Sequence, residues 1–150
     1  MRAAKHSERG ASMVETAIVM SVVLLLLFGI IDFGRAIYTY SFVAQAARQG
    51  ARWMIVRGSQ SCNITPHIDN CGALSPAVQT YIRGLNNGVL TSNNITATAA
   101  FSTCPSGAAV QNGPGCTVTV SVHYPFAFLA PFVRSTGINM SSTSAMVISQ

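Results

Sequence analysis

The feature that most constrains this chain is an uncharged apolar run, TAIVMSVVLLLLFGII, at residues 16–31. Extended back to Ala11, the segment has 21 residues, and as an α-helix it spans about 31 Å, close to the thickness of a bilayer's hydrocarbon core. A cleaved secretory signal also joins a basic start to an apolar run. No small-x-small cleavage site closes this run, however, and the nearest candidate, Ala44-Gln45-Ala46, lies too far along the chain. We therefore predict a retained transmembrane helix over residues 11–31.

Charge is scarce and unevenly placed along the chain. Only 9% of the 150 residues are charged, 49% are hydrophobic, and nine Lys or Arg outnumber four Asp or Glu. A soluble domain carries about 25% charged residues. No basic run with interleaved aromatic residues is present, so we expect contact with membrane lipid and no nucleic-acid binding. Most of the basic residues lie around the apolar run: Arg2, Lys5, Arg9, Arg35, Arg48, Arg52 and Arg57.

All four cysteines, Cys62, Cys71, Cys104 and Cys116, lie C-terminal to the predicted membrane helix. Their spacings match neither a CxxC redox motif nor the common zinc patterns. Two disulfides in an oxidising compartment are the economical interpretation. Three connectivities are open, and we favour sequential pairing because each bridge then closes a short loop. The N-terminus is accordingly expected in the cytoplasm and the C-terminal domain outside it.

Past Asp32 the chain changes from apolar on every face to a single apolar stripe. We expect the helix to continue through residues 32–57 and to stop near Gly58. The stripe could pack on the chain's own domain or on another subunit, and the sequence favours neither. Asp32 and Arg35, three residues apart, can pair on the helix surface. The stripe recurs at spacings of four and three residues, as Phe33, Ile37, Tyr40, Ala44, Ala47 and Ala51.

Residues 58–150 are expected to form one small α+β domain with three or more antiparallel strands. Residues 76–88, PAVQTYIRGLNNG, show apolar residues at helical spacing followed by an Asn-Asn-Gly stop. Residues 95–101 and 116–124 alternate with period two, and the valines of the second segment share one face. Residues 139–149, NMSSTSAMVIS, are typical of a final strand.

Groups that could carry catalysis are nearly absent from the predicted outer domain. Its single acid is Asp69, and its imidazoles are His67 and His123. Paired carboxylates need two acids, and no phosphate-binding glycine motif or nucleophile elbow occurs. His67 and Asp69 are interpreted as solvated loop residues, and His123 as an exposed strand residue. We expect no enzyme activity, no metal and no cofactor.

Glu15 is the residue that the membrane helix does not explain. Near the end of the run, a carboxylate could simply be an interfacial acid favoured by the helix N-terminus. If the chain is cut between Gly10 and Ala11, however, the new α-amine lies four residues from Glu15 on the same helix face. In helices stacked with an axial offset, the carboxylate of one chain can pair with the terminal amine of its neighbour and set their register.

A short basic leader at residues 1–10, a glycine before the cut, Glu15 and an apolar helix resemble the type IV prepilins. The stretch RGASMVETAIVMSVVLLLLFGIIDFGRAIYTY, followed by VAQAARQGARWM, resembles the TadE-like pseudopilins of the tight-adherence (Flp) pilus system. The C-terminal CTVTVSVHYPFAFLAPF and INMSSTSAMV resemble the end of such chains more weakly. Thr16 stands where the major Flp pilins have an aromatic residue, which argues against the main pilus subunit.

The resemblance implies cleavage after Gly10 by a prepilin peptidase and a role as a minor, pilin-like protein that assists pilus assembly. It implies other pilins or pseudopilins and the assembly platform as partners, in a single-pass protein of the cytoplasmic membrane that could enter the pilus. The alternative is a membrane-tethered outer binding domain whose helix is an uncleaved anchor.

Overall fold

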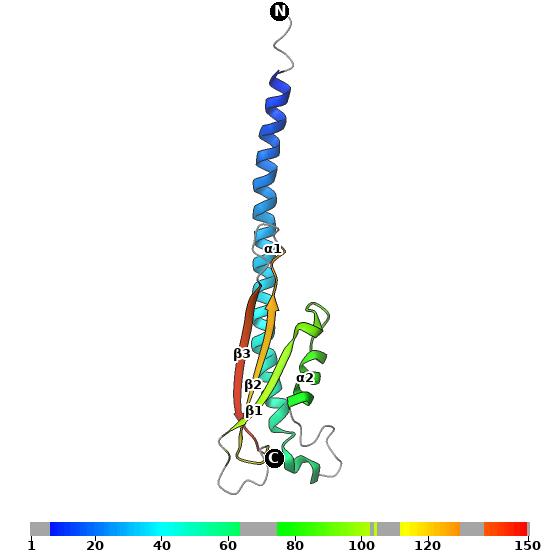
Figure 1. Ribbon diagram of the computed structural model, residues 1–150, viewed down its shortest axis with the longest axis vertical. Coiled ribbons are helices and arrows are strands. Elements are labelled where there is room, and N and C mark those ends of the chain that lie inside the picture. The colour runs from blue at the N-terminus through cyan, green and yellow to red at the C-terminus, as the bar shows by residue number, and fades with distance from the viewer. Residues whose placement is uncertain (1–6, 64–74, 103, 105–111, 130–136, 150) are drawn as a thin grey trace, which may run out of the picture.

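The computed structural model describes residues 7–63, 75–102, 104, 112–129 and 137–149. A long helix, α1 (Ser7–Ile55), leads into a small domain that holds a second helix, α2 (Ser75–Gly84), and a three-stranded sheet. The first half of α1 extends away from the domain, and its second half lies along it (Figure 1). The predicted α+β architecture with a long N-terminal helix is confirmed.

Helix α1 is continuous over 49 residues. The segment contains no proline and is rich in alanine, leucine and other good helix formers. Two hydroxyls in its apolar half donate to carbonyls of the same helix, Thr16 to Ser12 at 2.9 Å and Ser21 to Ile18 at 2.7 Å. These polar groups are therefore satisfied without water, as a helix surrounded by lipid requires.

The sheet is antiparallel, with β2 (Thr117–Phe126) between β1 (Thr96–Ser102) and β3 (Ile138–Val147). Even-numbered residues of β2 are buried, which confirms the predicted valine face. The strand runs two residues past its predicted end, through Pro125. Past His123, where the β1 ladder ends at Thr96, β2 pairs with β3 alone within the described sheet. Pro125 therefore lies where one side of the strand carries no partner strand among the described residues, a setting in which a strand tolerates proline.

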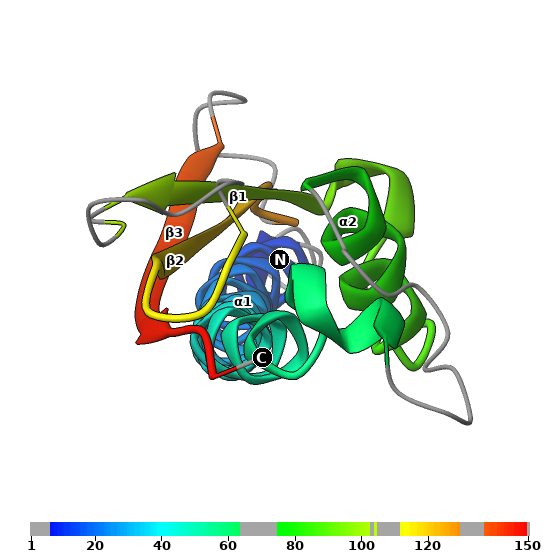
Figure 2. The ribbon, with the colours of Figure 1, turned by 90° about the horizontal axis from the view of Figure 1, so that it is seen from below.

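The core lies between α1 and the sheet, with α2 closing one side. Helix α1 packs on β2 and β3, and α2 packs on β1. Seen along α1, the sheet and α2 surround part of its circumference (Figure 2). Gly50 marks the closest approach of these elements, because a Cβ there would lie 2.8 Å from Ile82 Cδ1 and 3.1 Å from Val120 Cγ1. The largest buried apolar residues are Val43, Met54, Val78, Ile82, Ile95, Val118, Val120, Val122, Tyr124, Phe126 and Ile148.

Side chains of α2 occupy the outer edge of β1. The Ala97 amide donates to Gln79 Oε1, and the Ala99 amide donates to Ser75 Oγ at 3.0 Å. Gln79 Nε2 donates in turn to the Ile95 carbonyl at 2.7 Å. This edge of the sheet is thus closed to a further strand by side chains that replace a neighbouring backbone.

A disulfide joins Cys104 to the buried Cys116, just before β2. It is one of the two sequential pairs favoured from the sequence. By loop-closure entropy, a bridge across 12 residues stabilises the fold by about 3 kcal/mol. Cys71 and the side chain of Cys62 lie outside the described residues, so the second predicted pair stays a prediction.

Candidate functional site

The apolar first half of α1, which is predicted to span a membrane and which we call the membrane half, carries the residues predicted for processing and register. Gly10, Ala11 and Glu15 all lie on exposed helix surface. The helix already begins at Ser7 and therefore continues through the predicted cleavage position. By length and composition α1 can cross a membrane, and its most apolar window has no contact that buries it in the domain. This half of the helix is the part of the chain available to lipid and to other helices.

The apolar stripe of α1 is divided in the structure. Ala47 and Ala51 are fully buried in the domain. Phe33, Ile37 and Tyr40, by contrast, are 52–68% exposed, and Ala44, between the two groups, is half-buried. One part of the stripe thus packs on the chain's own domain. The other part, which we call the exposed stripe (Phe33, Ile37 and Tyr40), is not part of the buried core.

The division arises because the domain surrounds the two ends of this helix segment unequally. Near Gly50, the sheet and α2 both approach α1. Closer to the membrane half, the domain covers a neighbouring face, where Asp32, Thr39 and Val43 are buried. Sequence patterns missed this face because two of those three residues are polar. Thr39 is accommodated there because its hydroxyl donates to the Arg35 carbonyl at 2.8 Å.

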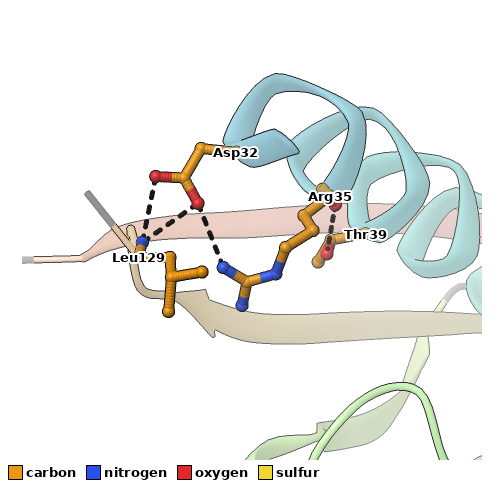
Figure 3. Close-up of polar contacts among 4 residues, drawn as sticks. All are labelled: Asp32, Arg35, Thr39 and Leu129. Atoms are coloured by element: carbon orange, nitrogen blue, oxygen red, sulfur yellow. Dashed lines mark hydrogen bonds and ion pairs between the residues drawn. The ribbon is translucent and has the colours of Figure 1, made fainter. Parts of the chain in front are cut away.

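Asp32 joins the helix to the far end of the sheet. Both of its carboxylate oxygens accept the Leu129 amide at 3.0 Å, and one also accepts Arg35 Nη1 at 3.1 Å (Figure 3). The Arg35 guanidinium lies 5.4 Å from the centroid of the Phe126 ring. The Asp32–Arg35 pair was predicted from spacing, and the contact with Leu129, 97 residues away, was not. The sequence feature that could have indicated this contact is the position of Asp32, an acid directly after an uncharged run.

The three residues considered as catalytic candidates, His67, Asp69 and His123, are not brought together in the described part of the structure. His123 is exposed on β2, whereas His67 and Asp69 lie outside the described residues. Within the described part of the chain, no group of three or more His, Cys, Asp or Glu side chains is placed to hold a metal ion. The geometry that distinguishes this chain is therefore the exposed surface of α1 and the junction at Asp32.

The comparisons with known proteins agree with the N-terminal resemblance. The model of the family described as TadE-like protein matches residues 10–52. The matched segment contains Gly10, Glu15, the whole apolar run and the exposed stripe. No curated protein and no solved structure gives a significant match to the chain.

Proposed function

We propose that this chain, which is TadE-like over residues 10–52, is a minor pilin-like protein that assists assembly of the tight-adherence pilus. Its helix α1 packs against helices of other pilins or pseudopilins on the assembly platform. The domain lies outside the cytoplasmic membrane, and the N-terminus lies in the cytoplasm. In this role the chain supplies contacts and register and does no catalysis.

The observation that carries the proposal is the exposed stripe. Phe33, Ile37 and Tyr40 extend the apolar surface of the membrane half beyond Asp32, on a helix face that the domain leaves uncovered. Ile37 and Tyr40 lie about 9 and 14 Å past Ile31 along the helix, beyond the headgroup layer. A simple anchor has no need of large apolar side chains there, because water opposes their exposure. A helix that packs in a bundle of helices does need such side chains, because the face that meets lipid in the membrane continues as the face that contacts neighbouring helices outside it.

Processing and register follow from the same helix. Cleavage after Gly10 by a prepilin peptidase leaves the α-amine of Ala11 one helical turn from Glu15. Both groups lie on exposed helix surface, so a neighbouring helix with an axial offset can bring its own carboxylate to that amine. A pair of this kind, removed from water between helices, specifies register more than it adds stability.

The proposal is tested by removing the exposed stripe without touching the core. In a strain that makes the pilus, Phe33→Ser with Tyr40→Ser should abolish or strongly reduce surface pili counted by electron microscopy. The matched control is Gln45→Ser with Gln49→Ser, which alters two exposed polar positions on the same helix and should leave piliation normal. Membrane levels of each variant are measured by immunoblot so that assembly is compared at equal protein.

Normal piliation in the Phe33→Ser, Tyr40→Ser variant would contradict the proposal. That outcome would favour the second candidate, a tethered outer binding domain, because a tether needs only the apolar run at residues 16–31.

A further inference from the structure

With α1 inserted in a bilayer as proposed above, the end of the domain nearest the membrane half of α1 falls at the level of the lipid headgroups. The uncharged run ends at Ile31, and Arg35 follows four residues later, about 6 Å further along the helix. The headgroup layer adds about 5–8 Å to each side of the hydrocarbon core. Because Asp32 accepts the Leu129 amide, the domain is held at this height and does not hang free of the surface.

A cavity of about 400 Å³ opens at this level. Its walls come from three parts of the chain: α1, the segment before β1, and the end of β2. Helix α1 contributes Arg35 and Tyr38, the segment before β1 contributes Leu90 and Asn94, and the end of β2 contributes Phe126. The lining thus combines one cation and hydrogen-bonding groups with apolar and aromatic surface, the mixture that fits a phosphate attached to a glycerol backbone.

Arg35 is the charged residue among those that line this cavity, and it is the more exposed member of its pair with Asp32. The Arg35 side chain is 48% exposed, whereas that of Asp32 is 6% exposed. Asp32 is turned toward the Leu129 amide, and Arg35 uses only Nη1 to reach it (Figure 3). Nε and Nη2 of Arg35 donate to no residue of the described chain, so the guanidinium fork has donors left for an anion.

Exposed apolar side chains surround the same end of the domain. Val89 lines the cavity, Leu129 bonds to Asp32 through its amide, and Ile138 pairs with Phe126 at the end of β2. Each of the three is more than half exposed. Side chains of this kind are favourable where they meet the boundary between headgroups and acyl chains, which is the boundary that the helix places beside them.

We propose that this cavity binds the phosphate of an anionic phospholipid in the leaflet on the domain side of the membrane. Arg35 supplies the charge and the fork of donors, and the apolar rim contacts the upper acyl chains. This inference rests on the membrane insertion that is part of the proposed function. A bound lipid at this place holds the domain at a defined tilt on the surface before the helix enters an assembly.

The test measures lipid binding by the purified full-length chain. Phosphatidylglycerol is titrated into the protein in a neutral detergent, and bound lipid is counted by native mass spectrometry. Wild type should retain phosphatidylglycerol over phosphatidylcholine, and Arg35→Gln should weaken the retention by about tenfold or more, since charge-assisted hydrogen bonds are lost. Arg48→Gln is the matched control, because Arg48 is exposed on the same helix and lies outside the cavity lining.

A second variant keeps the Asp32–Arg35 pair intact. Gly34 lines the cavity, and a Cβ there meets nothing within 4 Å, so Gly34→Leu should fill the cavity and reduce retention without unfolding the domain. Equal retention by wild type, Arg35→Gln and Gly34→Leu would overturn the proposal. So would equal retention of the two lipids, or displacement of lipid by millimolar inorganic phosphate, which would make free phosphate the ligand. The purified protein contains no pilus partner, so a negative result removes the lipid site alone, and the piliation assay judges the assembly role separately.

Discussion

One carboxylate, that of Asp32, connects the point where α1 leaves the apolar run to the end of the sheet. Burying a charge is costly unless it is paired and hydrogen-bonded. Here the cost is offset by the Leu129 amide and the Arg35 guanidinium, both within 3.1 Å. Both carboxylate oxygens share the Leu129 N–H, each at 3.0 Å. The contact ties the chain just after β2 to one position on α1, in addition to the packing of α1 on the sheet.

We expect Asp32→Asn to loosen this junction. The amide group keeps one acceptor for Leu129 but loses the charge, and the free energy of unfolding should fall by about 1.5–3 kcal/mol. Trp53 is the single tryptophan of the chain and stacks on Tyr81 in the domain, with ring centroids 5.0 Å apart. Denaturant unfolding followed by Trp53 fluorescence measures the stability change, and hydrogen exchange at the Leu129 amide reports the local opening.

Glu15→Gln serves as the control, because Glu15 is an exposed acid of the same helix and lies 17 residues before Asp32 in the chain. It should leave both Trp53 unfolding and Leu129 exchange unchanged. If Asp32→Asn behaved like this control, the contacts of Asp32 with Leu129 and Arg35 would contribute nothing measurable to the free energy of unfolding. The packing of the core alone would then hold the domain on α1.

At the scale of the elements, the two halves of the continuous helix α1 have different surroundings. Its first half is exposed on all sides, and its second half is partly enclosed by the sheet and α2 (Figure 2). Gly50 permits that enclosure, because Ile82 and Val120 both approach its missing side chain. The glycine is required by close packing of three elements and has an ordinary helical backbone.

We predict that Gly50→Val destabilises the domain. Its branched side chain would crowd the side chains of Ile82, Val120 and Val78, which must repack in a buried core, and overpacking of this kind costs about 1–3 kcal/mol. Gly34→Val is matched in residue type and helical setting, and a Cβ at Gly34 meets nothing within 4 Å. Thermal unfolding followed by Trp53 fluorescence should show a lower midpoint for Gly50→Val only. Equal midpoints for the two variants would mean that the side chains around Gly50 repack at no cost, and would contradict the prediction.

The strands and α2 were predictable because each buries one face of its own. Val118, Val120 and Val122 alternate with polar neighbours, and Val78 and Ile82 recur at helical spacing. The continuation of α1 was harder to interpret, since its stripe serves two surfaces. Nothing local distinguishes Ala47, which packs on the domain, from Tyr40, which does not, because the difference lies in how far the sheet extends along the helix.

At the scale of the whole molecule, an apolar helical half, uncharged over residues 16–31, projects from a domain that begins directly beyond it (Figure 1). The domain reaches up to Asp32, so little free chain separates the predicted membrane surface from folded protein. Whatever moves the helix along its axis must therefore carry the domain with it.

Processing is the prediction that belongs to this scale. When the full chain is produced together with a prepilin peptidase, N-terminal sequencing of the membrane fraction should begin at Ala11. Production with a catalytically inactive peptidase should leave the chain beginning at Met1. Intact mass measurement gives the fraction cut. A chain that begins at Met1 in both cases would remove the processed form, and with it the pairing of the Ala11 amine with Glu15 of a neighbouring helix.

Local chemistry in the sequence determined the long helix, the place of its apolar half, the three strands and the Gly10–Glu15 spacing, because each depends on residues close together in the chain. Only the tertiary structure decided which side of α1 the domain covers, that Asp32 receives the Leu129 amide, and that Arg35 faces a cavity at the membrane end. These depend on packing between segments up to 97 residues apart. Helical periodicity states which residues share a face, and the position of the neighbouring elements decides what that face meets.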